Sequence, residues 1–269
     1  MRTLLVVGIL LGVCMMAQGA IKTETVNYKA GETALQGYLA YDDAAGGKRP
    51  GVLVFPEWWG LNDYPKQRAR QLAEMGYVAL AADMYGNGLA ATDPTEAGKL
   101  AGQFRGAWET GGRALLRQRA QAALATLAQD PRVDPARLGA IGYCFGGTCV
   151  LELAYSAPNL TAAVTFHGGL TAPDPADFPQ IKAHFLILHG ADDPTVTAEQ
   201  IAATQKGLRE AQADWEMIYY GGAVHGFSNP ANDASPDHTK VAYNAEAARR
   251  SWETMGEFFK EILEKQKQN

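Results

Sequence analysis

One cysteine in this chain has the sequence surroundings of a nucleophile. Cys144 lies between Gly142 and Gly146, with the apolar run 137–141 before it and 148–154 after it. The two runs predict a short buried strand and a helix, and the glycines permit a sharp turn between them. The thiol would then stand at a helix N-terminus, which favours a thiolate. The alternative interpretation is a buried structural cysteine, since free cysteine is among the most buried residue types.

Two later loops carry an acid and a histidine. Asp192 and Asp193 follow the apolar run 185–188, and His225 follows the run 215–220. Nucleophile, acid and histidine is the chain order of an α/β-hydrolase triad. Each interval leaves room for one or two strand–helix units, so we expect three loops to converge at one edge of a sheet.

The residues around these positions resemble the dienelactone hydrolase family of α/β-hydrolases. The resemblance runs from about Val26 to the C-terminal helix. It implies a carboxylic ester or lactone hydrolase, and a cysteine elbow with a glutamate after the third strand is specific to few hydrolases. The matching segments are 134–147 with its Gly-Tyr-Cys-Phe-Gly-Gly elbow, Gly190-x-x-Asp193-x-x-Val196, Val224-His225-Gly226-Phe227 and Pro56-Glu57-Trp58-Trp59-Gly60.

The resemblance implies a role for each member of the triad. Cys144 is the expected nucleophile and His225 the expected base. The Gly-x-x-Asp spacing selects Asp193, rather than Asp192, as the acid that orients the histidine. The expected reaction is acyl transfer in two steps through a thioester intermediate.

The resemblance also implies roles for the loop after the third strand. The family glutamate that matches Glu57 lies beside the thiol, helps to hold it neutral at rest and takes its proton when substrate binds. An ordinary loop carboxylate is the alternative, and either Glu57 or His225 is a candidate for the first proton transfer. Backbone N–H groups of Trp58 and Phe145 would form the oxyanion hole.

The chain departs from the family where the substrate is held. Family members that open dienelactone rings hold the substrate carboxylate with two arginines, and the best-matching positions here are Asn87 and Asn229. An amide cannot offer a charged bidentate fork, so we expect neutral esters or other lactones as substrates. Tyr85 matches a pocket tyrosine of the family, although a surface-loop tyrosine is the alternative.

Two other classes of protein stay open. A thiol redox protein would use Cys144 and Cys149 together, and a binding protein on a hydrolase scaffold would bind ligand without turnover. We expect no metal and no cofactor, because the sequence has neither clustered ligands at short spacing nor a phosphate-binding glycine loop.

The first twenty residues predict a secretory signal peptide, with cleavage after Gly19 or Ala20. Residues 21–269 then form the single expected domain, secreted or periplasmic, with no stable membrane insertion. The net charge is −5 and no basic cluster is present, so nucleic-acid binding is not expected.

Strand and helix patterns alternate along the chain and predict an α/β-hydrolase fold, a doubly wound and mostly parallel sheet of about eight strands. The first two strands alternate in polarity, as in an antiparallel edge. The expected strands are 21–28, 35–41, 51–55, 77–82, 138–143, 160–166, 185–189 and 215–220, and the expected helices are 64–75, 94–104, 112–129, 145–156, 198–211 and 238–265.

Overall fold

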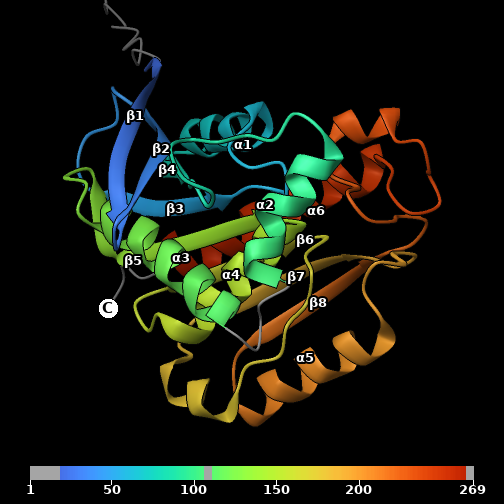
Figure 1. Ribbon diagram of the computed structural model, residues 1–269. Coiled ribbons are helices and arrows are strands. Elements are labelled where there is room, and N and C mark those ends of the chain that lie inside the picture. Colours follow the sequence, from blue (N-terminus) through green and yellow to red (C-terminus); the bar gives the residue numbers. More distant parts are fainter. Residues whose placement is uncertain (1–18, 106–110, 265–269) are drawn as a thin grey trace, which may run out of the picture.

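A computed structural model describes residues 19–105 and 111–264, so nearly all of the expected signal peptide lies outside the described residues. Eight strands form one sheet in the order β1-β2-β4-β3-β5-β6-β7-β8, which is drawn in Figure 1. The strands are β1 (Ile21–Ala30), β2 (Thr33–Asp42), β3 (Arg49–Phe55), β4 (Val78–Ala81), β5 (Val133–Tyr143), β6 (Ala162–Phe166), β7 (His184–Gly190) and β8 (Trp215–Tyr220).

Strand direction follows the predicted pattern. β1 pairs with β2, and β2 with β4, in antiparallel fashion, whereas all pairs from β4 through β3 to β8 are parallel. The parallel strands are almost continuously apolar because helices cover both of their faces. β3, for example, is buried at every position. The predicted doubly wound sheet with an antiparallel edge is confirmed.

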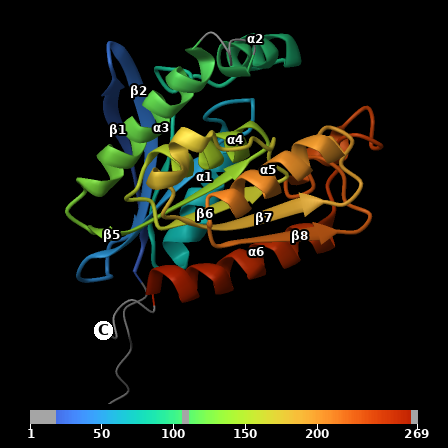
Figure 2. The ribbon, with the colours of Figure 1, turned by 90° about the horizontal axis from the view of Figure 1, so that it is seen from below.

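Helices lie on both faces of the sheet and enclose two hydrophobic cores. One core packs α3, α4 and α5 against the sheet, and the other packs α1 and α6 against its opposite face. Figure 2 shows α5 and α6 on opposite sides of β7 and β8. The helices are α1 (Asp63–Glu74), α2 (Pro94–Arg105), α3 (Arg113–Ala128), α4 (Phe145–Ser156), α5 (Ala198–Glu210) and α6 (Ala245–Phe259), with a π-helical turn η4 (Lys260–Glu264) after α6.

The last helix begins later than predicted. Residues 238–244 are not helical, because this segment pairs with the loop after β8 through a bridge between His225 and Val241. The side chain of Asn244 accepts a hydrogen bond from the backbone of Ala247 and so caps α6 at its true start. The loops after β6 and β8, predicted as irregular, contain the short 3₁₀ helices η2 (Pro175–Gln180) and η3 (Pro230–Ala234).

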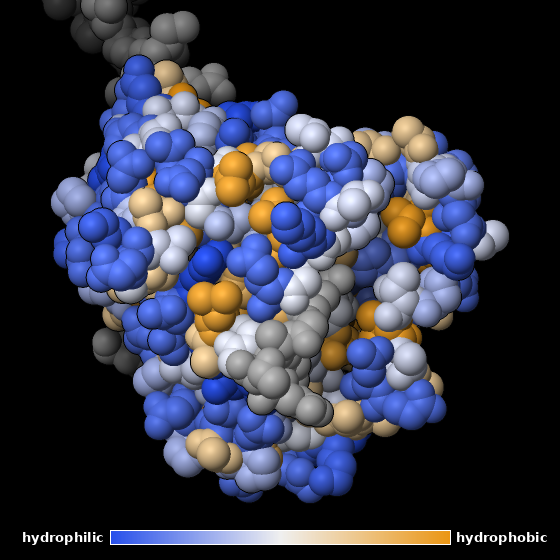
Figure 3. Space-filling view, in the orientation of Figure 1, coloured by the Kyte–Doolittle hydropathy of each residue, from blue (hydrophilic) through white to orange (hydrophobic). Residues whose placement is uncertain are grey.

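On the face seen in Figure 3, the hydrophobic residues among those described form small groups between hydrophilic ones. Within residues 19–105 and 111–264, no helix is both long and apolar enough to cross a bilayer.

Candidate active site

Cys144 stands on a tight turn between β5 and α4. Its backbone has φ of 53°, a left-handed conformation that is strained for a residue with a side chain. Glycines make the turn possible, since a Cβ on Gly142 would lie 2.0 Å from the carbonyl oxygen of Gly146, and one on Gly146 would lie 2.3 Å from that of Phe55. The thiol is partly exposed at the N-terminus of α4, so it is accessible to a reactant.

Asp193 and His225 meet at the same edge of the sheet, on the loops that follow β7 and β8. Nδ1 of His225 lies 2.8 Å from Oδ2 of Asp193. Thr195 contacts both residues, because its hydroxyl donates to Oδ1 of Asp193 at 2.7 Å and lies 2.9 Å from Nδ1 of His225. Asp192 instead accepts from the backbone of Gly222. The structure thus brings His225 to Asp193 rather than to its neighbour.

The electrostatics of the site join His225 to both partners. Burial acts to lower the pKa of His225. The charge of Cys144, the hydrogen bond between His225 and the Cys144 sulfur, and the hydrogen bond between His225 and Asp193 outweigh burial and raise the pKa of His225 to about 10. Burial acts to raise the pKa of Asp193, but the hydrogen bonds from His225 and Thr195 outweigh burial, so the pKa of Asp193 is lowered. The neighbouring sulfur and carboxylate thus favour the protonated form of the His225 imidazole.

Glu57 is buried and is held by Asn229. The amide Nδ2 of Asn229 donates to Oε2 of Glu57 at 2.7 Å, while its Oδ1 accepts from the backbone of Ala231 and caps η3. Burial raises the pKa of Glu57 above its usual value, although Asn229 and the charges of His225 and Arg68 oppose the shift. Asn229, predicted to line the substrate pocket, thus has its side chain engaged with Glu57.

Tyr85 contacts both residues of the predicted oxyanion hole. Its hydroxyl donates to the carbonyl oxygen of Trp58 at 2.7 Å, and its ring stacks on that of Phe145 with centroids 6.1 Å apart. Phe145 is the first residue of α4, and Trp58 lies in the turn that follows β3. Tyr85 is buried, and these two contacts tie the loop after β3 to the start of α4.

Asn87 lies apart from these residues. Asn87 is exposed, and it lines a surface hollow together with residues of the β1–β2 hairpin, among them Asn27, Lys29 and Gln36. Its backbone N–H donates to the carbonyl oxygen of Ala34 at 3.0 Å. The structure therefore places Asn87 beside the hairpin and gives it no contact with the triad among the described residues.

Two residues that are not among the predicted site residues, His167 and Ser228, lie close to His225. His167 is fully buried at the end of β6, and its ring packs edge-on against His225 with centroids 5.4 Å apart. Its Nε2 lies 2.8 Å from the hydroxyl of Ser228. Burial and the charge of His225 hold the pKa of His167 well below its usual value, so its ring is neutral. Its position directly after a buried strand was the available signal.

The structure also tests whether the protein could hold a metal ion or use Cys144 and Cys149 as a redox pair. The described residues contain no group of three His, Cys, Asp or Glu side chains placed to hold a metal ion. Cys149 is buried in the core, five residues beyond Cys144 along α4. Five helical steps place two residues about 140° apart around the axis, which does not favour their pairing in a redox site.

Comparison with known proteins agrees with this fold. A solved structure titled m3DLH is 44% identical, with a TM-score of 0.86 over 91% of this chain and 100% of that one. A metagenomic dienelactone hydrolase-like promiscuous phosphotriesterase, P91, is 43% identical, with a TM-score of 0.84 over 91% and 99% of the two chains. A protein of Synechocystis sp. named "Putative carboxymethylenebutenolidase" is 29% identical over 90% of this chain and 98% of its own length.

The sequence pattern of the family described as "Dienelactone hydrolase family" matches residues 35–263, which is most of the chain. The predicted resemblance and the prediction of a carboxylic ester hydrolase are thereby confirmed at the level of the family. This chain belongs to the dienelactone hydrolase family.

Proposed function

We propose that this protein hydrolyses neutral carboxylic esters or lactones with Cys144 as nucleophile, His225 as base and Asp193 as the acid that orients the base. The observation that carries the proposal is the hydrogen-bonded series from the sulfur of Cys144 through His225 to Asp193, from three loops at one sheet edge. A thiolate beside an imidazolium is a strong nucleophile at neutral pH.

In the proposed first step the sulfur attacks the carbonyl carbon, and the negative charge moves to the carbonyl oxygen. Backbone N–H groups of Trp58 and Phe145 are the proposed donors to that oxygen. His225 then protonates the departing alkoxide, which leaves a thioester on Cys144. Water attacks the thioester with His225 as general base, and the carboxylic acid departs as the thiol is restored.

The polar groups near the site support a substrate without a carboxylate. The amide of Asn229 hydrogen-bonds within the protein through both its nitrogen, to Glu57, and its oxygen, to the backbone of η3. Asn87 lies at the β1–β2 hairpin. Neither offers the charged fork that grips a carboxylate group. Uncharged aryl esters and simple lactones are therefore the proposed substrates.

Phosphotriester hydrolysis is a second candidate. A relative that is 43% identical over most of the chain is titled a promiscuous phosphotriesterase. Phosphotriesters are neutral, like the esters proposed above, and a thiolate can attack phosphorus as it attacks a carbonyl carbon. The same two donors and the same imidazole would then serve a phosphoryl oxygen and a leaving alkoxide.

The test is a hydrolysis screen of the purified protein over aryl acetates, lactones, a dienelactone and an aryl phosphotriester. We expect turnover of the uncharged compounds and little of the dienelactone. Cys144→Ala and His225→Ala should each lower kcat by at least about a thousandfold, with an unchanged circular dichroism spectrum. Undiminished turnover in both variants would exclude this site, and absence of any turnover in the parent would favour a binding protein.

A further inference from the structure

A groove between α1 and α6 lies on the molecule apart from the triad. It is open to solvent and has a volume of about 270 Å³, and none of Cys144, Glu57, Asp193 or His225 lines it. Its walls come from α1, from the segment after His225 and from the first two turns of α6. Its lining includes Tyr64, Arg68, Ser228, Tyr243, Arg249 and Trp252.

The groove is positively charged. Arg68 and Arg249 both line it, and no carboxylate belongs to its lining residues. Arg249 pairs on the exposed side with Glu253 at 2.6 Å, an ion pair that solvent screens. The two guanidinium groups therefore meet no acidic side chain on the groove walls.

Arg68 is the cation at the base of the groove. Its Nη1 donates to Gln71 at 2.9 Å, and its Nη2 donates to the hydroxyl of Tyr64 and to the carbonyl oxygen of Ser228, each at 3.0 Å. All three acceptors are neutral, and the buried Nε has no hydrogen-bond partner among the described residues. Buried charges are normally paired. The charge of Arg68 acts on the carboxylate of Glu57, but Glu57 does not line the groove and makes no hydrogen bond to the guanidinium among the described contacts, so an anion in the groove can still bind there.

Aromatic rings form the walls around this charge. The guanidinium of Arg68 lies 4.7 Å from the ring centroid of Trp252 and 5.0 Å from that of Tyr64. Tyr243 lines the same groove. Flat apolar walls with a few charged donors are typical of sites for small organic molecules, and this volume suits a compact one.

We propose that this groove binds a small organic anion, a carboxylate carried on a flat apolar body, with the carboxylate directed at Arg68 and Arg249 and the body between the aromatic rings. The site is distinct from the catalytic centre. Ser228 nevertheless joins the two, because its hydroxyl lies 2.8 Å from Tyr64 and 2.8 Å from His167, whose ring packs on His225.

The test is calorimetric titration of the purified full chain with benzoate, and with benzamide as a neutral compound of the same shape. We expect saturable binding of benzoate and at least about tenfold weaker binding of benzamide, as loss of a charged hydrogen bond implies. Benzoate should bind equally well after iodoacetamide has blocked Cys144. Loss of binding on alkylation would assign the ligand to the catalytic site and overturn the proposal.

Variants locate the site. Arg68→Gln should weaken benzoate binding about tenfold or more, and Arg249→Gln about two- to fivefold. Arg250→Gln is the matched control, because it also lies on α6 in an exposed ion pair, with Glu246, but does not line the groove. If Arg68→Gln does not fold, the comparison of benzoate binding by Arg249→Gln and by Arg250→Gln still tests the proposal. Equal binding by these two, or no saturable binding by the parent, would overturn the proposal.

Discussion

At the scale of single residues, the burial of Glu57 costs free energy of folding whenever its carboxyl group is ionised. A carboxylate enclosed by protein and held by one neutral amide is less stable than the same group in water. Its raised pKa means that the folded protein binds the Glu57 proton more tightly than the unfolded chain does. The contribution of Glu57 to stability therefore falls as the pH rises above the unfolded pKa, which is about 4.3.

Glu57→Gln should consequently make the protein more stable at pH 7 and change its stability little at pH 4. Glutamine keeps an oxygen that can accept from Asn229 and carries no charge to bury. The proposed mechanism passes every proton through His225, so kcat of the variant should change by less than about tenfold, and a fall of about a hundredfold or more would assign Glu57 to the proton transfer. Urea unfolding at the two pH values measures the first effect, and kcat measures the second.

The exposed Glu74, on the last turn of α1, provides the control, since Glu74→Gln should leave both midpoints and kcat unchanged. An equal gain in stability at pH 4 and pH 7 for Glu57→Gln would contradict an ionisation penalty at this position.

Some contacts of the candidate site could be predicted from the sequence and others could not. Cys144 and Asp193 follow the mostly buried strands β5 and β7, and His225 follows the partly exposed edge strand β8. Strand order therefore brings them to one edge without detailed knowledge of any loop. The contact between Asn229 and Glu57 joins residues 172 positions apart and depends on how the loop after β8 winds into η3. No local pattern encodes that pairing, and family matching alone assigned Asn229 to the substrate.

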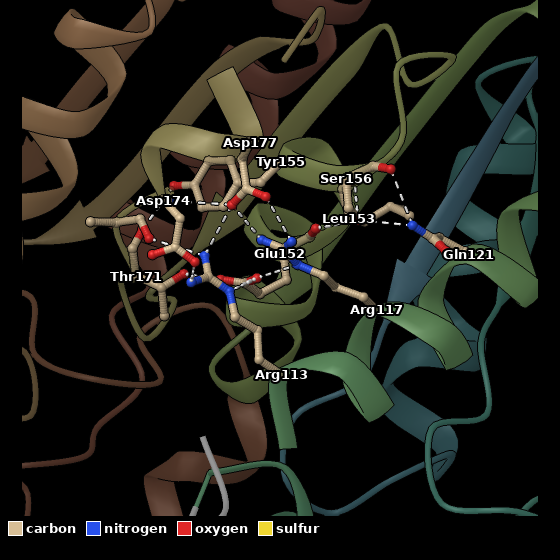
Figure 4. A network of polar contacts seen from close by, with 11 residues as sticks. Arg113, Arg117, Gln121, Glu152, Leu153, Tyr155, Ser156, Thr171, Asp174 and Asp177 are labelled. Atoms are coloured by element: carbon tan, nitrogen blue, oxygen red, sulfur yellow. Dashed lines mark hydrogen bonds and ion pairs between the residues drawn. The ribbon is translucent and has the colours of Figure 1, made fainter. Parts of the chain in front are cut away.

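At the scale of elements, a charge network fixes α4, the helix whose N-terminus carries Cys144. Figure 4 shows Glu152 of α4 facing Arg113 and Arg117 of α3. Glu152 is fully buried and accepts from Nε of Arg113 at 2.6 Å, from Nε of Arg117 at 2.8 Å and from Thr171 at 2.9 Å. Arg117 also bonds both carboxylate oxygens of Asp177 in η2.

This network also holds the loop that contacts the catalytic turn. Thr171 belongs to the segment after β6, in which the backbone of Gly169 donates to the carbonyl oxygen of Cys144 at 3.2 Å. Thr148 of α4 donates to the carbonyl oxygen of Gly169 at 2.9 Å. The charges on α3, α4 and η2 thus keep the loop and the helix start in one arrangement.

Glu152→Gln should destabilise the fold by about 3 kcal/mol, because it leaves two guanidiniums facing a neutral amide. We expect the lower end of the range for broken buried pairs, since both arginines are partly exposed. Glu253→Gln, which breaks an exposed pair with Arg249, should cost less than about 0.5 kcal/mol. Denaturant unfolding of the two variants measures the difference, and similar losses would show that the network contributes no more than a surface pair.

The elements themselves were mostly predictable, because apolar periodicity reports burial on one or both faces. β8 and α4 have the predicted bounds, Trp215–Tyr220 and Phe145–Ser156. The segment 238–244 was wrongly predicted as helix because its composition does not disfavour one. Tertiary pairing with His225 determines its conformation instead, and α6 begins at Ala245, seven residues later than the predicted start at 238.

At the scale of the whole molecule, the folded domain begins where the proposed signal peptide ends. Ile21 is the first residue of β1 and pairs with Asp42 of β2, while the backbone of Ala20 donates to Asp43. A chain that began at Ala20 or Ile21 would therefore retain every strand of the sheet.

We therefore expect the full chain, expressed in a bacterium with a periplasm, to be exported and to begin at Ala20 or Ile21. Intact mass and N-terminal sequencing of the periplasmic fraction measure the new terminus. Leu11→Arg places a charge in the apolar run that export requires, so this variant should stay in the cytoplasm with residues 1–19 attached. Recovery of the parent chain unprocessed in the cytoplasm would contradict a cleaved signal, because the compartment and the terminus would then both match those of the blocked variant.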